Sequence, residues 1–530
     1  MRLDCHCFCG ARPSVGDVGV AGPARAFTAR RLSAGALAGL ALWALSGCAA
    51  LPAVPEPAAA ASAVLAQPLA PQWRSPWPEA GAEVTPGAAP SPAAKPASPA
   101  AAPPATDLAQ WWLAFDDPHL SRLIGQALQA HTSVRSAQAA LQQARALDAV
   151  SAAAQGPQVQ ATASSQRAQV GSASAASAWR AGLDATWELD WFGQRQQARA
   201  ATAAEARAAA AQVAQAQVSV AAEVALTFFE WRLQQQRWVV AQRRLALQEE
   251  FVQIVGWRLQ AGLMSSQDLE QARLNLAQLR ATLPDIEAAQ GQAEAALALL
   301  TGRSPQSALD LPAAGPIPSP GLELARTIPA DTLRQRPDVQ RAQERLSSAA
   351  ARVAQADAAR LPTLALGGTL DWRSPRVSDL FDPAALTRTL LLRLSASLFD
   401  GGAARAQLQA QQAALEQSRL ELEAAVLTAL REVEHALLAL QASAQRLQHV
   451  QQAADAAAAT EALALLRLTS GLIDYRIWLE TRQNLLSAQY ELSAARAAWS
   501  ADHVRLYKAL GGGWSADKPQ AALPEPHDPA

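Results

Sequence analysis

The chain has 530 residues and a formal net charge of −1, so its charge gives no indication of nucleic-acid binding or of a strongly anionic partner. Half of the residues are apolar, but alanine dominates that half and aromatic residues are few. Because alanine favours helix and buries little surface, this composition predicts long, closely packed helices and excludes a bulky globular core.

The four cysteines all lie within the first 48 residues, so no disulfide can hold the body of the chain together. Cys5, Cys7 and Cys9 surround His6, but this spacing is too tight for an ordinary zinc site and no second ligand pair follows. We interpret the stretch as a non-functional or misassigned N-terminal extension, and we expect neither a metal nor a cofactor.

Residues 1–47 have the pattern of a secretory signal peptide. Arginines at 25, 30 and 31 precede an apolar run over 32–45 that is too short to span a membrane. The run ends in Leu45-Ser46-Gly47-Cys48, which matches the bacterial lipobox. We therefore predict cleavage before Cys48 and attachment of several acyl chains to it, which would give durable anchoring. The alternative is an ordinary signal peptide with a chance cysteine.

Residues 48–105 are rich in proline and alanine and carry few large apolar groups. Such a segment cannot bury enough surface to offset its chain entropy, so we predict an extended, lipid-anchored linker. We expect residues 515–530 to form a flexible C-terminal tail.

The body of the chain shows internal repetition. Six positions recur at one offset of 205, and four more recur at an offset of 209. The matches are Val134, Ala137, Gln138, Leu141, Ala144 and Pro157 with Val339, Ala342, Gln343, Leu346, Ala349 and Pro362, and Gly262, Leu263, Arg273 and Asn275 with Gly471, Leu472, Arg482 and Asn484. We predict two structural repeats, 106–315 and 316–514, although low-complexity alanine could account for some of the matches.

Each half contains two stretches in which apolar and polar residues alternate, at 158–170 and 179–191 and again at 363–373 and 389–398. Strands of about ten residues cross a bilayer when tilted, but a half-buried sheet of a soluble protein would alternate in the same way. Four strands cannot close a barrel, and an open edge is not tolerated in lipid. If the strands span a membrane, several chains must share one barrel, and three copies would give twelve strands.

The remaining segments predict helix. The stretches 194–261 and 404–470 contain no proline, and each would extend for about 100 Å. Helices of this length need packing partners, which second helices running back to about Leu300 and Leu510 would provide after turns at Gly262 and Gly471. We predict shorter helices over 120–155 and 331–360, ahead of each strand pair.

Four local motifs, together with the lipobox, resemble those of the TolC-like outer-membrane efflux channels, in their NodT-type lipoprotein branch. The motifs are Trp187-Glu188-Leu189-Asp190-Trp191-Phe192-Gly193, Arg336-Pro337-Asp338-Val339, Phe399-Asp400-Gly401-Gly402 and Leu506-Tyr507-Lys508-Ala509-Leu510-Gly511-Gly512-Gly513-Trp514. They also have structural interpretations: glycines suit the corners between strand and helix, Pro337 suits a first helical turn, and the Gly511–Gly513 run suits a helix end.

The resemblance implies a mixed α and β fold: a homotrimer with a twelve-stranded transmembrane β-barrel that continues into a long α-helical periplasmic barrel. It also implies a passive conduit for small molecules in the cell outer membrane. Its partners would be a periplasmic adaptor protein and an inner-membrane efflux pump of the resistance-nodulation-division class.

By resemblance, the two helical turns form the tip of the tunnel and meet the adaptor. The candidate contact residues are Gly262, Ser265, Ser266, Gly471, Asp474 and Tyr475. The resemblance also implies acidic rings and ionic latches just above the tip, and the best matching gate candidates are Asp474 and Glu480, with Arg467 or Arg476 as partners. Threefold symmetry would bring three copies of one carboxylate together and attract cations. Solvated charges near a helix turn are the alternative.

Two other functions are alternatives to a small-molecule conduit. A type I protein-secretion channel shares the fold, but Cys48 and the Gly-Gly-Gly-Trp ending favour efflux. A lipid-anchored coiled-coil scaffold would have no need of the four alternating stretches. We expect no enzymatic activity, because the sequence shows no plausible Ser/His/Asp set, no phosphate loop, and histidines that lack ligand spacing.

Overall fold

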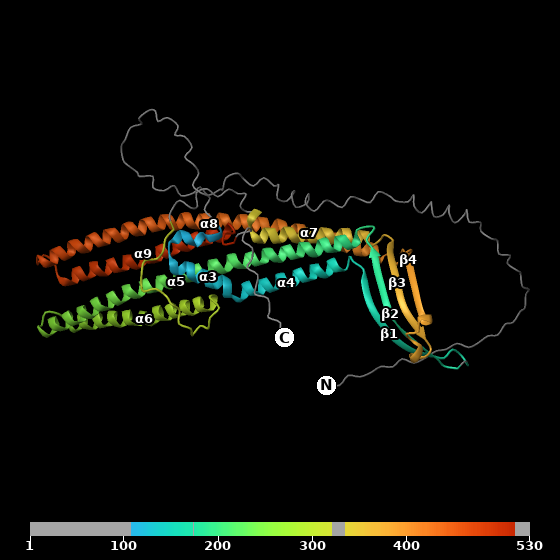
Figure 1. Cartoon of the computed structure of the whole chain (residues 1–530). Helices are drawn as coiled ribbons and strands as arrows, with labels where there is room; N and C mark the ends of the chain where they lie inside the picture. The colour runs from blue at the N-terminus through green and yellow to red at the C-terminus, as the bar shows by residue number, and fades with distance from the viewer. Residues whose placement is uncertain (1–107, 173, 321–333, 515–530) are drawn as a thin grey trace, which may run out of the picture. The chain divides into compact units, whose positions relative to one another are not determined.

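A computed structural model describes residues 108–172, 174–320 and 334–514 (Figure 1). The predicted signal peptide, the lipid-attachment site Cys48, the linker and the C-terminal tail lie outside the described residues. The described residues all belong to one unit of the chain.

The described elements follow the same order twice along the chain. A 3₁₀ segment η1 (Leu108–Phe115) and helix α3 (Pro118–Ala130) come first. The first series is α4 (Thr132–Ala153), β1 (Gln158–Ala168), β2 (Ala176–Leu189), α5 (Gln194–Gln260) and α6 (Ser266–Leu300). The second is α7 (Pro337–Ala358), β3 (Thr363–Ser374), the 3₁₀ turns η3 (Val377–Asp379) and η4 (Pro383–Ala385), β4 (Leu386–Ser395), α8 (Ala403–Thr469) and α9 (Tyr475–Ala509).

The two long helices α5 and α8 each contain 67 residues, and α6 and α9 each contain 35. At 1.5 Å per residue, α5 and α8 each extend for about 100 Å. Each begins after a glycine with positive φ, Gly193 at 79° and Gly402 at 91°. Only glycine adopts this conformation without strain, which confirms the expected role of the Phe-Gly and Gly-Gly corners.

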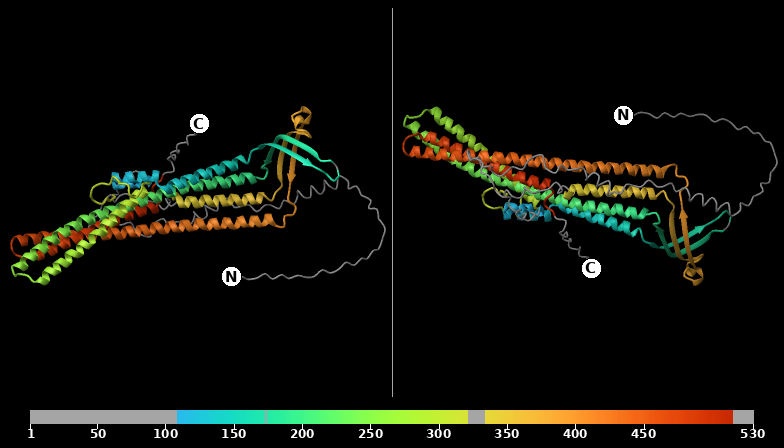
Figure 2. Two further views of the ribbon diagram at one scale, coloured as in Figure 1. Left: turned by 90° about the horizontal axis from the view of Figure 1, so that it is seen from below. Right: turned by 90° about the horizontal axis from the view of Figure 1, so that it is seen from above.

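Helix α5 contacts α4, α6, α7 and α9, whereas α8 contacts α7 and α9. In the half of the bundle next to the sheet, the helices therefore lie side by side in the order α4, α5, α7, α8 (Figure 2). In the half that ends in the helix turns, the order is α6, α5, α9, α8. One cluster of buried residues, including Trp111, Phe228 and Tyr507, joins η1, α3, α5, α6 and α9. A second cluster, around Leu346 and Leu440, joins α7, α8 and α9. Among the described residues, no helix is both long and apolar enough to cross a membrane.

The four strands form one antiparallel sheet in the order β1-β2-β3-β4. Because side chains alternate between the two faces of a strand, the register assigns each residue to a face. One face carries Trp179, Leu183 and Trp187 of β2. On this face Leu370 of β3 is in register with Leu183, and Leu366 of β3 and Leu392 of β4 are in register with Trp187. The other face carries polar residues, among them Thr162, Arg180, Asp184, Asp371 and Thr387.

Several predicted boundaries were wrong, among them that of the fourth strand, which was expected over 389–398 and spans Leu386–Ser395. The helix expected over 120–155 is two helices, because His131 has an extended backbone with ψ of 133° and accepts the backbone N–H of Ser133 as the N-cap of α4. The strand expected up to residue 191 ends at Leu189, before the turn to α5. Helix α7 begins at Pro337 and not at 331, because proline suits the first helical turn, where its missing N–H needs no partner. Residues 321–333 lie outside the described part.

Arg336 connects three helices at the start of α7. Its guanidinium contacts carboxylate oxygens of Asp338 and Glu432, each at 2.7 Å, and donates to the carbonyl of Ala509 near the end of α9. The arginine side chain is buried, so these contacts compensate for its lost hydration. Helix α9 ends at this junction, and Gly511 follows with a φ of 77°.

Candidate functional site: the paired helix turns

The turns that join α5 to α6 and α8 to α9 have the same backbone. Gly262 and Gly471 have φ values of 72° and 71°. The residue after each glycine donates its backbone N–H to a carbonyl in the last helical turn, Leu263 to Arg258 and Leu472 to Arg467, both at 2.8 Å. This is the Schellman helix ending, which requires a left-handed residue and therefore favours glycine.

The helix that follows the first turn is capped within the turn. The Ser265 hydroxyl accepts the N–H of Asp268, and the Asp268 carboxylate accepts the N–H of Ser265 at 3.0 Å. This capping box satisfies two donors that have no partner in the helix. The hydrogen bonds from Ser265 keep the pKa of Asp268 below its usual value.

The second turn is capped by Asp474, which also binds the other hairpin. One carboxylate oxygen accepts the N–H of Arg476, and both oxygens accept hydrogen bonds from Arg258 Nη1 at 3.0 and 3.1 Å. These bonds, the one from Arg258 foremost, hold the pKa of Asp474 below its usual value. The partner expected from the sequence was Arg467 or Arg476. The structure places Arg258 there instead, and Arg476 contributes its backbone N–H.

Tyr475 follows Asp474 and packs against Trp478 with ring centroids 5.2 Å apart. Burial, with the nearby charge of Glu250, raises the pKa of the Tyr475 phenol to about 12. The phenol therefore stays neutral at physiological pH. Tyr475 lies between the two hairpins, because Glu250 belongs to α5.

Sequence reasoning missed a polar cluster inside the second hairpin. Glu461 of α8 is buried, accepts a hydrogen bond from Trp478 Nε1 at 3.2 Å and contacts Arg482 Nη1 at 3.2 Å. At the offset of 209, Glu461 corresponds to Val252 and Trp478 to Leu269. The sequence signal for this cluster was that the second repeat has a glutamate where the first repeat has a valine.

The other predicted tip residues lie on the surface. Gly262, Ser265, Ser266 and Gly471 are exposed, as are the gate candidates Glu480, Arg467 and Arg476. Large apolar side chains are exposed beside them, notably Trp257, Leu263 and Leu472. Exposed apolar groups of this size are typical of a surface that meets a partner.

Three polar contacts connect α5 to α9 along what we call the seam between the hairpins. They are the Arg258–Asp474 pair, a hydrogen bond from Gln483 Nε2 to Gln248 Oε1 at 3.0 Å, and the Arg237 guanidinium 4.9 Å from the centre of the Tyr490 ring. Gln248 also donates to the carbonyl of Ala272 in α6. Sequence reasoning could not find the seam, because its partners are more than two hundred residues apart in the chain.

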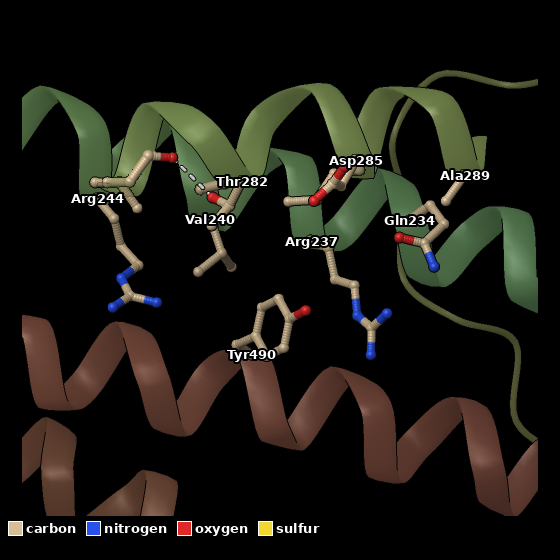
Figure 3. A pocket seen from close by; sticks show the side chains of 11 residues that line it. Gln234, Arg237, Val240, Arg244, Thr282, Asp285, Ala289 and Tyr490 are labelled. Carbon is tan, nitrogen blue, oxygen red and sulfur yellow. Dashed lines mark hydrogen bonds between the residues drawn. The ribbon is translucent and has the colours of Figure 1, made fainter. Parts of the chain in front are cut away.

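A groove of about 340 Å³ opens along this seam between α5, α6 and α9. Figure 3 shows Arg237 and Arg244 extending from α5 toward α9, with Tyr490 between them. Asp285 of α6 also lines the groove. The hairpins are therefore joined at the seam by polar contacts, and a groove opens beside them.

The arrangement provides contacts that can be made and broken. In the part of the chain that the structure describes, no group of three or more His, Cys, Asp or Glu side chains is placed to hold a metal. Asp474 and Arg258 are each partly exposed, so their pairing can respond to a partner.

Comparison with known proteins identifies several relatives. A family model described as "Outer membrane efflux protein" matches residues 123–303 and 328–512. The chain is 28% identical over 413 residues to the probable efflux pump outer membrane protein SepC of Pseudomonas putida, covering 76% of this chain and 85% of SepC. It is 26% identical to the probable outer membrane lipoprotein SilC of Salmonella typhimurium, covering 76% and 88%. The solved structure of the outer-membrane channel OprN is similar with a TM-score of 0.71 and 30% identity, covering 77% and 93%.

Proposed function

The chain belongs to the outer membrane efflux protein family, and we propose that three copies form the outer-membrane conduit of a tripartite efflux pump. The observation that carries the proposal is the combination of a four-stranded sheet with two edges and two helices of about 100 Å in one chain. The pump and the adaptor are separate proteins, and the conduit itself is passive.

The sheet supports a barrel shared between chains. Strands β1 and β4 are the edges of the described sheet, and each has a partner strand on one side only. Edges in lipid leave backbone groups without hydrogen bonds, so β4 of one copy would pair with β1 of the next. Three copies give twelve strands, with the apolar face toward lipid and the polar face toward the lumen.

The helices support a tunnel. In three copies, α5 and α8 with their shorter neighbours would form a helical wall that extends from the barrel into the periplasm. The same order of elements in both halves, and the two matches to the family model, support an origin by duplication. The proposed bounds of the two repeats are 106–315 and 316–514.

The paired turns are the proposed tip. Their exposed residues Gly262, Ser265, Ser266 and Gly471 would meet the adaptor, together with the half-buried Tyr475. The Arg258–Asp474 pair would hold the two hairpins together at rest, and the adaptor would open the tip by separating them. Glu480, Arg467 and Arg476 remain gate candidates, because they are exposed near the same turn.

The lipid anchor at Cys48 belongs to the proposal as well. Similarity to the probable outer membrane lipoprotein SilC supports it. Replacement of Cys48 by serine is expected to abolish incorporation of labelled palmitate, while the trimer still forms because the barrel does not depend on the anchor.

Imaging of the protein extracted in detergent from the outer-membrane fraction tests the proposal. We expect particles with threefold symmetry, a short barrel and a helical tunnel about 100 Å long. Monomers, or rods without a barrel, would contradict the conduit and favour an anchored scaffold.

A further inference from the structure

Four charged side chains gather on the polar face of the sheet, and we call them the sheet charge cluster: Arg180, Asp184, Asp371 and Arg373. Arg180 Nη2 lies 2.8 Å from Asp184 Oδ1, and Arg180 Nε lies 3.4 Å from Asp371 Oδ2. Arg373 Nε donates to the same Asp371 oxygen at 2.5 Å. Thr162 of β1 donates to Asp184 at 2.7 Å, so the contacts extend across three strands.

Gly182 makes room for this cluster. It is the register partner of Asp371, and a Cβ atom at position 182 would lie 2.5 Å from Asp371 Cβ and 2.6 Å from the carbonyl oxygen of Leu370. The Asp371 side chain is thus packed close over the neighbouring strand, between the two arginines. A buried carboxylate on an otherwise open sheet face requires such compensation by cations.

The exposed fractions of the four side chains differ by sign of charge. Arg373 is 61% exposed and Arg180 34%, whereas Asp184 is 19% exposed and Asp371 is fully buried. The carboxylates therefore lie beneath the guanidinium groups. Although the four formal charges sum to zero, a molecule that approaches this face meets the positive groups first.

We propose that the sheet charge cluster forms a cationic collar on the lumen side of the barrel, which attracts solutes bearing carboxylate, sulfonate or phosphate groups. The inference rests on the proposed function, because only a closed barrel has a lumen. The collar lies at the end of the sheet away from the helices, since Arg180 is near the start of β2 and Arg373 near the end of β3. Three copies would place six guanidinium groups around the pore, and a wall of low dielectric strengthens their field.

A purely structural role is the competing explanation, because the cluster also fixes the register between β2 and β3. The two explanations differ in what Arg373 does. Removing its charge leaves the Arg180–Asp371 and Arg180–Asp184 contacts in place, so the sheet is retained. The local potential, however, loses its most exposed positive group.

A thiol at position 387 reports this potential without depending on the tip of the tunnel. Thr387 is exposed and is the register partner of Asp371 on the polar face. The full-length chain with Thr387→Cys is treated, in intact cells, with membrane-impermeant thiol reagents of equal size, one anionic and one cationic. Background labelling, measured on the chain without the substitution, is subtracted. The rate of labelling by the anionic reagent is divided by the rate for the cationic reagent, and this ratio is compared with the same ratio for a small neutral thiol in solution.

We expect a ratio above that of the free thiol. Arg373→Gln should lower it by a factor of about three, as expected for a unit charge a few ångströms from the reporter in water. Arg373→Lys should restore most of it, which a geometric role of the guanidinium would not allow. Arg388→Gln is the matched control: Arg388 is the register partner of Leu370 on the apolar face, so its removal should leave the ratio nearly unchanged.

Two failures can be distinguished. If chemical cross-linking shows the trimer and both reagents reach position 387, but Arg373→Gln leaves the ratio unchanged, the collar is wrong and the barrel stands. If neither reagent reaches position 387 and no trimer is cross-linked, the proposed function fails, and the collar fails with it.

Discussion

The two helix turns have the same backbone but different side-chain chemistry. Each follows a 67-residue helix, turns at a glycine with φ near 70°, and leads into a 35-residue helix. The first turn caps its own helix through Ser265 and Asp268, whereas the second uses Asp474, which also binds Arg258 of the other hairpin. The backbone that the two turns share builds the hairpins, and the side chain of Asp474 in the second turn connects them.

Of the differences between the two repeats, we expect the largest in the stability lost when the residue that precedes α7 or α4 is replaced. Arg336 and His131 are the N-cap residues of these helices and differ by the same offset of 205. Arg336→Met would strand two carboxylates and should cost about 2–4 kcal/mol, somewhat below the range for a fully buried pair because Glu432 is partly exposed. His131→Ala should cost about 1 kcal/mol. Melting of the helical circular dichroism signal checks this order, and equal losses would contradict it.

The turn glycines should behave alike. A Cβ atom would meet no other atom within 4 Å at Gly262 or at Gly471, so replacement by alanine costs only the left-handed backbone, about 1–2 kcal/mol. We expect Gly262→Ala and Gly471→Ala to lower the melting temperature equally. A much larger loss at one site would show that its turn is packed against something else.

Replacing the cap residues of the two turns should have different effects on the protein. Ser265→Ala removes the capping box and should cost about 1 kcal/mol. Asp474→Asn keeps an oxygen for the N–H of Arg476, because asparagine also caps helices, and removes the charge that binds Arg258. Asp474→Asn should therefore weaken the contact between the hairpins and lower the melting temperature less than Ser265→Ala does. A fall in melting temperature as large as that of Ser265→Ala would contradict this division.

The smallest effect concerns pH. The pKa of Asp474 is lowered in the folded chain, so the carboxylate contributes stability above its unfolded pKa of about 3.9, and this contribution is lost as pH falls through the folded value. We therefore expect the resting conductance of the channel in planar bilayers to be constant between about pH 5 and 8 and to rise only below about pH 4. A change near pH 6 would assign the control to a different group.

The sequence predicted the elements better than their contacts. The long helices, the four strands and the turn glycines follow from proline spacing, alternation and glycine positions, which are local signals. The break at His131 was missed because its neighbours Thr132 and Ser133 do not exclude helix by themselves. The Arg258–Asp474 pair and the Glu461 cluster were missed because they depend on how hairpins pack across many residues. Arg467 and Arg476 were expected as partners from the resemblance to related channels, whereas in the structure the Asp474 carboxylate binds Arg258, which lies 216 residues earlier in the chain.

The central claim is that Asp474 of the second turn holds the resting tip together by binding Arg258 of the first hairpin. The Ser265–Asp268 cap of the first turn has no such role. Single-channel conductance in planar bilayers tests it with Arg258→Gln and Ser265→Ala in the otherwise unchanged protein. We expect Arg258→Gln to raise the resting conductance and Ser265→Ala to leave it at the wild-type value. An unchanged conductance in Arg258→Gln, or an equal rise in both variants, would contradict the account.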